Sequence, residues 1–207
     1  MSTKIYTAGK KPGEAKKALI MVHGRGGSAA DILSLAQHLD VKDYALFAPQ
    51  AAQHSWYPYS FLALPSDNEP ALSSALMALG EAVKEAEAAG IGKEQIYFLG
   101  FSQGACLTLE FVTRNAAKYG GVIAFTGGLI GDKVYEENYK GDFQQTPVFI
   151  GTSDPDPHVP VDRVLASTAL LRKMNASVLE KVYPMMGHTI TAEEIRQAEQ
   201  WVLNREA

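Results

Sequence analysis

The sequence predicts an α/β fold in which a mostly parallel central sheet is flanked by helices. Short apolar runs bounded by turn residues recur along the 207-residue chain, and longer segments with helical spacing separate them. Several runs are continuous rather than alternating, which is typical of strands buried on both faces. Strands that alternate with helices imply a parallel sheet covered on both sides. The predicted strands are residues 18–22, 44–48, 96–101, 121–125, 148–150 and 178–183.

The predicted helices lie between these strands. Ser28 and Asp31 have the spacing of a helix-capping pair ahead of Ile32, and Thr191 with Glu194 has the pattern of a capping box that opens the last helix. Leucines and valines at three- and four-residue steps predict the remaining helices. These helices are residues 70–89, 105–116 and 161–174, and the least patterned segments are 50–67 and 127–146.

Composition narrows the functional class. Hydrophobic residues make up 46% of the chain and charged residues 20%, which is typical of a soluble globular protein. The net charge of −4 does not suggest a nucleic-acid partner, and no apolar run is long enough for stable membrane insertion. The N-terminus lacks the apolar core of a secretory signal, and a single cysteine, Cys106, fits a reducing compartment. We therefore expect a cytoplasmic protein.

A serine flanked by glycines follows the third apolar run, residues 96–101, in the pentapeptide Gly100-Phe-Ser-Gln-Gly104, and a predicted helix comes after it. Functional groups of parallel sheets collect where strands end and helices begin. Gly-x-Ser-x-Gly at such a junction is the nucleophile elbow, which exposes a serine hydroxyl at a sharp turn. The pattern predicts that Ser102 is a catalytic nucleophile.

A serine nucleophile needs a base that a carboxylate orients. His188 follows the last predicted strand and is the predicted base. The acid is expected after the strand at 148–150, where the sequence offers both Asp154 and Asp156 in a proline-rich turn. We favour Asp156 and keep Asp154 as the alternative. His158, in the same turn, is a less favoured base.

The glycine-rich loop after the first predicted strand has the composition of an oxyanion loop. Backbone N–H groups stabilise the tetrahedral intermediate of acyl transfer, and one of them belongs to the residue after the nucleophile. We therefore expect the N–H of Gln103 and the N–H of Arg25 to form the oxyanion hole. The loop lacks the lysine and the glycine spacing of phosphate-binding loops. His23 is expected to hold nearby backbone.

The substrate pocket is predicted from apolar side chains on loops. Trp56 and Tyr57 belong to an aromatic cluster in the segment 50–67, and Met185 stands three residues before His188. Such side chains line substrate pockets, although they equally suit the covering of a sheet edge. An exposed aromatic patch would favour a homodimer. The five histidines and one cysteine show no metal-ligand spacing, so no metal or cofactor is expected.

Four motifs together resemble the phospholipase/carboxylesterase family of α/β hydrolases, which includes the acyl-protein thioesterases. The resemblance implies an α/β-hydrolase fold without a cap domain, in one domain over residues 1–207, and a small-molecule ester as substrate. The alternatives are an acyl-protein thioesterase or lysophospholipase, and a non-catalytic receptor. The segment 53–62 lacks the Trp-Phe-Asp form of the thioesterases, which favours a carboxylesterase. The motifs are His23–Gly27, Gly100–Gly104, Asp156–Pro160 and Gly187–Thr189.

Overall fold

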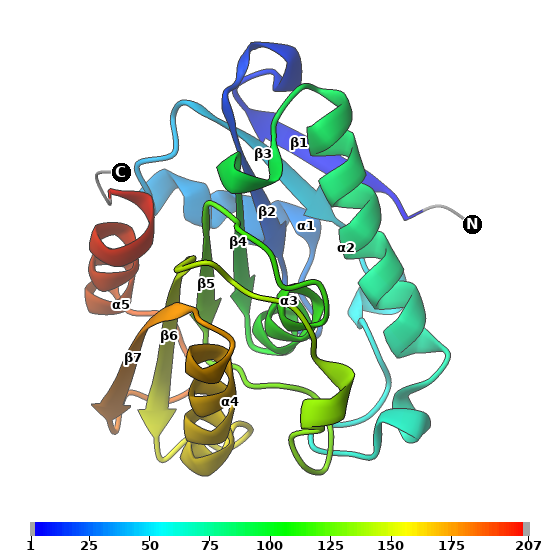
Figure 1. Ribbon diagram of the computed structural model, residues 1–207, viewed down its shortest axis with the longest axis vertical. Helices are drawn as coiled ribbons and strands as arrows, with labels where there is room; N and C mark the ends of the chain where they lie inside the picture. The colour runs from blue at the N-terminus through cyan, green and yellow to red at the C-terminus, as the bar shows by residue number, and fades with distance from the viewer. Residues whose placement is uncertain (1–2, 205–207) are drawn as a thin grey trace.

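The computed structural model describes residues 3–204, and a seven-stranded sheet runs through this part of the chain (Figure 1). The strand order is β1-β3-β2-β4-β5-β6-β7, in which β1 pairs antiparallel with β3 and every other pair is parallel. The predicted domain of residues 1–207 includes residues 1–2 and 205–207, which lie outside the described residues. The strands are β1 (Ile5–Gly9), β2 (Lys17–Val22), β3 (Tyr44–Pro49), β4 (Ile96–Phe101), β5 (Gly121–Phe125), β6 (Pro147–Asp154) and β7 (Ser177–Pro184).

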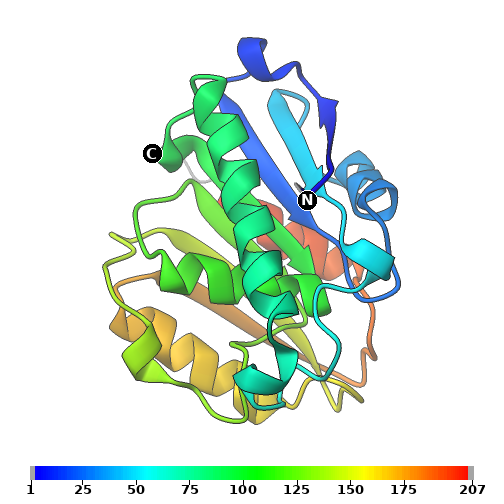
Figure 2. The same ribbon diagram turned by 90° about the vertical axis from the view of Figure 1, so that its right-hand side faces the viewer.

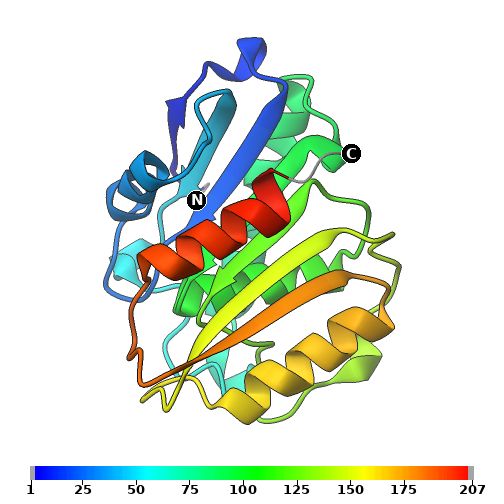
Figure 3. The same ribbon diagram turned by 90° about the vertical axis from the view of Figure 1, so that its left-hand side faces the viewer.

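Helices cover both faces of the sheet, as predicted. Helices α2, α3 and α4 lie on one face (Figure 2), whereas α1 and α5 lie on the other (Figure 3). The helices are α1 (Ala29–Ser34), α2 (Ala71–Ala88), α3 (Gln103–Arg114), α4 (Val161–Lys173) and α5 (Ala192–Ala198), which continues as a π-helix over Glu199–Leu203. Short 3-10 turns occupy Pro12–Glu14, Leu35–His38, Ala52–His54, Pro65–Asn68, Lys93–Gln95 and Glu136–Asn138. Within residues 3–204 we find no helix with the length and apolarity needed to cross a bilayer.

The central strands are buried on both faces, which explains their continuous apolar runs. Along β2, Ile20 packs into the core under α2 and α3, while its neighbours Leu19 and Met21 pack into the core under α1 and α5. All three side chains are fully buried. Because successive side chains of a strand point to opposite faces, two helical layers demand apolar residues at every position.

The two predicted caps are present. The Ser28 hydroxyl accepts the Asp31 N–H at 3.2 Å, and the Asp31 carboxylate accepts the Ser28 N–H at 2.8 Å. Thr191 and Glu194 make the same reciprocal pair at the start of α5, at 3.3 and 3.1 Å. Each pair satisfies backbone donors that a helix start leaves free.

Strand β1 is the element that the apolar pattern did not predict. It is an edge strand with four of its five residues exposed, so it has no buried run to detect. Its Tyr6, for example, is 40% exposed. An edge strand is held by backbone hydrogen bonds on one side only, and these leave little trace in side-chain composition.

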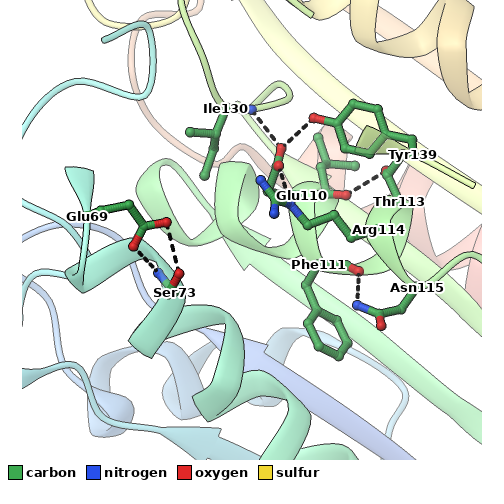
Figure 4. A network of polar contacts seen from close by, with 10 residues as sticks. Glu69, Ser73, Glu110, Phe111, Thr113, Arg114, Asn115, Ile130 and Tyr139 are labelled. Atoms are coloured by element: carbon green, nitrogen blue, oxygen red, sulfur yellow. Dashed lines mark hydrogen bonds and ion pairs between the residues drawn. The ribbon is translucent and has the colours of Figure 1, made fainter. Parts of the chain in front are cut away.

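The unpatterned segment 127–146 is anchored to α3 by the buried Glu110 (Figure 4). The carboxylate accepts the Ile130 N–H at 3.0 Å and the Tyr139 hydroxyl at 2.8 Å, and it pairs with the Arg114 guanidinium at 2.7 Å. A carboxylate is buried at low cost only when donors of this kind surround it. This carboxylate therefore joins two parts of the segment, at Ile130 and Tyr139, to α3.

Removal of this anchor is expected to destabilise the protein. Glu110→Ala leaves a buried N–H and a buried hydroxyl without a partner, and we expect the free energy of unfolding to fall by about 3 kcal/mol. Urea denaturation measures the change. Glu69→Ala is the matched control, because that exposed carboxylate binds Ser73 at the start of α2 and its loss costs about 1 kcal/mol or less. Equal losses in the two variants would contradict the anchoring role.

Candidate active site

Five loops meet at the carboxyl-terminal edge of the parallel strands. The loop after β2 carries Arg25, the loop after β3 carries residues 50–59, and the turn after β4 carries Ser102. Asp156 and His188 follow β6 and β7. Parallel strands bring their carboxyl ends to one edge, so residues far apart in the sequence come together there.

Ser102 stands on a strained turn between β4 and α3. Its φ and ψ are 55° and −120°, a region that costs non-glycine residues free energy. The Ser102 N–H donates to the Phe125 carbonyl at 2.9 Å and holds the turn against β5. A Cβ on Gly100 would lie 2.4 Å from the Gly104 carbonyl oxygen, and one on Gly104 would lie 2.2 Å from the Val22 carbonyl oxygen. Only glycine at these two positions lets α3 approach β2 and β4 so closely.

The imidazole of His188 lies between Ser102 and Asp156. Its Nε2 is 2.8 Å from the Ser102 hydroxyl oxygen, and its Nδ1 is 2.8 Å from a carboxylate oxygen of Asp156. The Phe101 ring packs beside the imidazole with centroids 5.3 Å apart. Because the carboxylate accepts only, the hydrogen bond at Nδ1 requires a proton there. Nε2 of the neutral ring is then free to accept the serine proton.

Asp156, rather than Asp154, reaches the histidine. Its side chain is fully buried and also accepts the N–H groups of His158 at 2.8 Å and Val159 at 2.9 Å. Burial raises the pKa of this carboxyl, but the hydrogen bonds from His158, His188 and Val159 outweigh it and hold the pKa below its ordinary value. Asp154 is exposed, and its carboxylate forms no hydrogen bond within residues 3–204.

Ser153 ties the acid loop to the histidine loop, a contact that sequence reasoning missed. Its hydroxyl donates to the Pro155 carbonyl at 3.0 Å and accepts the Gly187 N–H at 2.9 Å. The Met185 N–H adds a bond to the Asp154 carbonyl at 3.1 Å. The available signal was a polar residue at the end of a buried strand, directly before the candidate acids.

A cavity of about 420 Å³ opens beside Ser102 and His188. Tyr57 lines it, as predicted for the pocket, but Trp56 and Met185 do not, and these two predictions are corrected. Trp56 is buried against the His23 ring, and its indole N–H donates to the His23 carbonyl at 2.8 Å, so it belongs to the loop's interior. Met185 turns outward at a residue with φ of 54° and is 80% exposed. Pro58, Tyr59, Ser60, Phe61, Cys106, His158 and Val159 are further lining residues.

Arg25 and Gln103, whose backbone N–H groups are the predicted oxyanion donors, line the same cavity as Ser102. Gln103 is the first residue of α3, where a helix offers no partner to an N–H. The Arg25 N–H lies in the loop after β2. Neither N–H donates to another group in the part of the chain that the structure describes. Their sequence positions match those of oxyanion donors.

His23 fixes the backbone of this loop. Its Nδ1 bonds the Gly24 carbonyl at 2.8 Å, and its Nε2 accepts the Ala51 N–H at 3.2 Å. Accepting at Nε2 requires the neutral ring, and burial lowers the pKa of His23 accordingly. The expected backbone-binding contacts are present. No three metal-ligating side chains gather anywhere between residues 3 and 204.

Glu194 lies beneath the histidine loop with one oxygen unpaired. Its Oε2 accepts the Thr191 N–H, whereas its Oε1 is buried without a hydrogen-bond partner among the described residues. Burial raises the pKa of Glu194 to about 7, and the bond from Thr191 only partly opposes the rise. The carboxyl therefore stays protonated at pH values where a free glutamate has ionised.

This raised pKa predicts a pH-dependent stability. Between the ordinary pKa of 4.5 and about 7, the folded state holds one proton more than the unfolded state, so stability falls as pH rises through this window. We expect Glu194→Gln to remove a decline of about 1–3 kcal/mol. Denaturation at a series of pH values measures the difference from the wild type. Glu193→Gln, on the half-buried neighbour, should keep the wild-type slope between pH 4.5 and about 7, and an unchanged slope in Glu194→Gln would contradict the assignment.

Comparisons with known proteins agree with the predicted α/β-hydrolase fold. The model of the phospholipase/carboxylesterase family matches residues 7–204. A crystal structure of a phospholipase/carboxylesterase from Dyadobacter fermentans is 59% identical with a TM-score of 0.97, covering 98% of this chain and 97% of that one. A probable carboxylesterase, SOBER1-like, from Arabidopsis thaliana is 30% identical over 75% of this chain and 60% of its own length. Acyl-protein thioesterase 1 from Saccharomyces cerevisiae is 28% identical over 87% of this chain and 89% of its own length.

The family model covers strands β2 to β7, part of β1 and all five loops of the site, and the predicted α/β-hydrolase fold is confirmed. The chain accordingly belongs to the phospholipase/carboxylesterase family.

Proposed function

We propose that the chain is a serine hydrolase that cleaves carboxylic esters through an acyl-enzyme on Ser102. The observation that carries the proposal is the pair of 2.8 Å hydrogen bonds that join Asp156 to His188 and His188 to Ser102. A serine hydroxyl in this arrangement loses its proton as it attacks, which a lone serine cannot do at neutral pH. Relatives named as carboxylesterases and acyl-protein thioesterases support the same chemistry.

The reaction proceeds in two acyl transfers. Ser102 Oγ attacks the ester carbonyl while His188 Nε2 takes its proton, and the buried Asp156 carboxylate stabilises the imidazolium. The N–H groups of Arg25 and Gln103 stabilise the negative oxygen of the tetrahedral intermediate. His188 then protonates the departing alcohol, and a water molecule repeats the sequence on the acyl-enzyme to release the acid.

The cavity supports esters of small to moderate size. Its volume of about 420 Å³ lies near the lower end of the range for ligand pockets, and aromatic side chains form much of its wall. An acyl-protein thioesterase or lysophospholipase is the second candidate, because curated relatives carry the first of these names. We expect kcat/KM to peak at short or medium acyl chains in a series of p-nitrophenyl esters and matched thioesters. A sharp optimum at long chains, or a preference for thioesters, would support the second candidate instead.

A phosphonate probe separates an enzyme from a receptor on the same scaffold. Covalent labelling that raises the intact mass by one adduct, and that Ser102→Ala abolishes, supports the hydrolase. Absence of labelling in the wild type would support a receptor. Ser73→Ala is a suitable control, because Ser73 is exposed on α2, outside the five loops that form the site.

Location and assembly belong to the same proposal. The single cysteine, Cys106, is buried and free, which supports a reducing compartment such as the cytoplasm.

Tyr59, 60% exposed at the cavity, supplies an aromatic surface for a homodimer. Light scattering in solution decides the second point, since a monomer at micromolar concentration would rule the dimer out.

A further inference from the structure

The loop after β2 and the loop after β3 are joined by polar contacts along their length. The Gly26 N–H donates to the His54 carbonyl at 2.7 Å, and the His54 ring bonds the Gly27 carbonyl at 2.8 Å. The Trp56 indole N–H donates to the His23 carbonyl from the other side. The first loop carries one proposed oxyanion donor, and the second forms the aromatic wall of the cavity.

The Arg25 guanidinium is committed to this second loop. Its two terminal nitrogens donate to the carbonyls of Tyr57, Pro58 and Tyr59 and to the Ser55 hydroxyl, at 2.7–3.0 Å. Within residues 3–204 it has no carboxylate partner. Charged donors form stronger hydrogen bonds than neutral ones, so one side chain binds four of the five residues in the segment 55–59.

Gln103 holds the same loop from α3. Its side-chain oxygen accepts the Trp56 N–H at 3.0 Å, and its side-chain nitrogen donates to the Tyr57 carbonyl at 2.9 Å. The amide is 6% exposed, so both bonds are shielded from water. The two residues whose backbone N–H groups are the predicted oxyanion donors therefore both use their side chains on one loop.

The direction of the Arg25 N–H is also fixed. The Gly24 carbonyl accepts the His23 ring N–H at 2.8 Å and the Gly27 N–H at 3.1 Å. Because a trans peptide is planar, its C=O and the following N–H point in opposite directions. The two hydrogen bonds that the Gly24 oxygen accepts therefore fix the direction of the Arg25 N–H, which points the opposite way. The hydrogen bonds of the guanidinium hold the Arg25 side chain.

We propose that the side chains of Arg25 and Gln103 are positioning residues that lock the cavity wall and the oxyanion hole into one rigid unit. This inference rests on the proposed function. Transition-state stabilisation depends on donors placed within a few tenths of an ångström, and a shift of about 1 Å costs about 10²-fold in rate. The side chains touch no reacting atom, and they act through the backbone groups that do.

The test uses substitutions that leave both backbone donors in the chain. In Arg25→Met and Gln103→Met, we expect kcat per phosphonate-titrated site to fall about 10–100-fold with a much smaller change in KM. A boronic acid forms a tetrahedral adduct with an active serine, and its affinity should fall by a similar factor. Arg25→Lys retains a charged donor and should recover part of the loss. Arg172→Met is the control, because that guanidinium also donates to a backbone carbonyl but at the far end of α4.

Each outcome either supports or overturns the positioning role of the two side chains. Wild-type kcat and boronic-acid affinity in both variants, or a loss confined to KM or to melting temperature, would overturn the positioning role. Where a methionine variant does not fold, Arg25→Lys and Gln103→Asn replace it, and unchanged kcat in these would overturn the inference equally. A wild-type chain that neither reacts with the phosphonate nor binds the boronic acid contradicts the proposed function and this inference together. A reactive wild type with unaffected variants contradicts the inference alone.

Discussion

Ser102→Ala and His188→Ala should each lower kcat by about 10⁶-fold, because either change removes the activated nucleophile as a unit. The serine without its base does not lose its proton, and the base without its serine has no attacking oxygen to serve. Steady-state hydrolysis of a p-nitrophenyl ester at saturating substrate measures the loss. KM should change little in both variants, whereas the melting temperature should fall in His188→Ala, because the buried Asp156 carboxylate loses a donor there.

The double variant sharpens this expectation. Groups that act together are not additive, so Ser102→Ala combined with His188→Ala should be no slower than either variant alone. His38→Ala, on an exposed histidine at the end of the turn after α1, is the matched control and should retain wild-type turnover. A further large drop in the double variant, or turnover within tenfold of the wild type in either single variant, would contradict the assigned roles.

Asp156→Asn should lower kcat by about 10⁴-fold. The replacement amide can donate to His188 Nδ1, which would leave the proton on Nε2 and remove the base that faces Ser102. The backbone bonds from His158 and Val159 can still reach the remaining side-chain oxygen, so the loop should keep its shape. The loss should therefore appear in kcat, with little change in the free energy of unfolding.

Asp154→Asn provides the comparison within the same turn. Its carboxylate is exposed and lies two residues away along the chain, so full activity is expected. Loss of activity in Asp154→Asn with normal activity in Asp156→Asn would reverse the assignment. Equal, full activity in both variants would show that neither carboxylate orients the base.

The sheet was predictable because burial on both faces leaves a continuous apolar signal. The runs at 96–101 and 121–125 coincide with β4 and β5, and the caps at Ser28 and Thr191 begin α1 and α5. The edge strand β1 was not predictable, since its exposed side chains have no such pattern. The end of β6 was also placed short, because Thr152, Ser153 and Asp154 continue the pairing with β7 after the apolar run ends.

The candidate site was predictable where local chemistry restricts residue type. A tight strand-to-helix turn requires glycines, and the loop order places an acid and a histidine after later strands. The choice between Asp154 and Asp156 depended on where the turn after β6 points, which only three-dimensional geometry gives. Trp56 and Tyr57 show the same limit, because both are buried aromatic residues of one loop and composition cannot tell which of them lines the cavity.

The loop 55–59 is held through the carbonyls of Tyr57, Pro58 and Tyr59, the N–H groups of Trp56 and Tyr59, and the side chains of Ser55 and Trp56. The ring of Tyr59, 60% exposed, makes none of these hydrogen bonds, whereas the ring of Tyr57 is buried in the core. The hydrogen bonds that fix the loop backbone thus do not depend on which side chain stands at position 59. Substitutions at Tyr59 can therefore change which esters are accepted while the backbone of the cavity wall stays in place, and this position is where new specificities can arise at low cost to turnover.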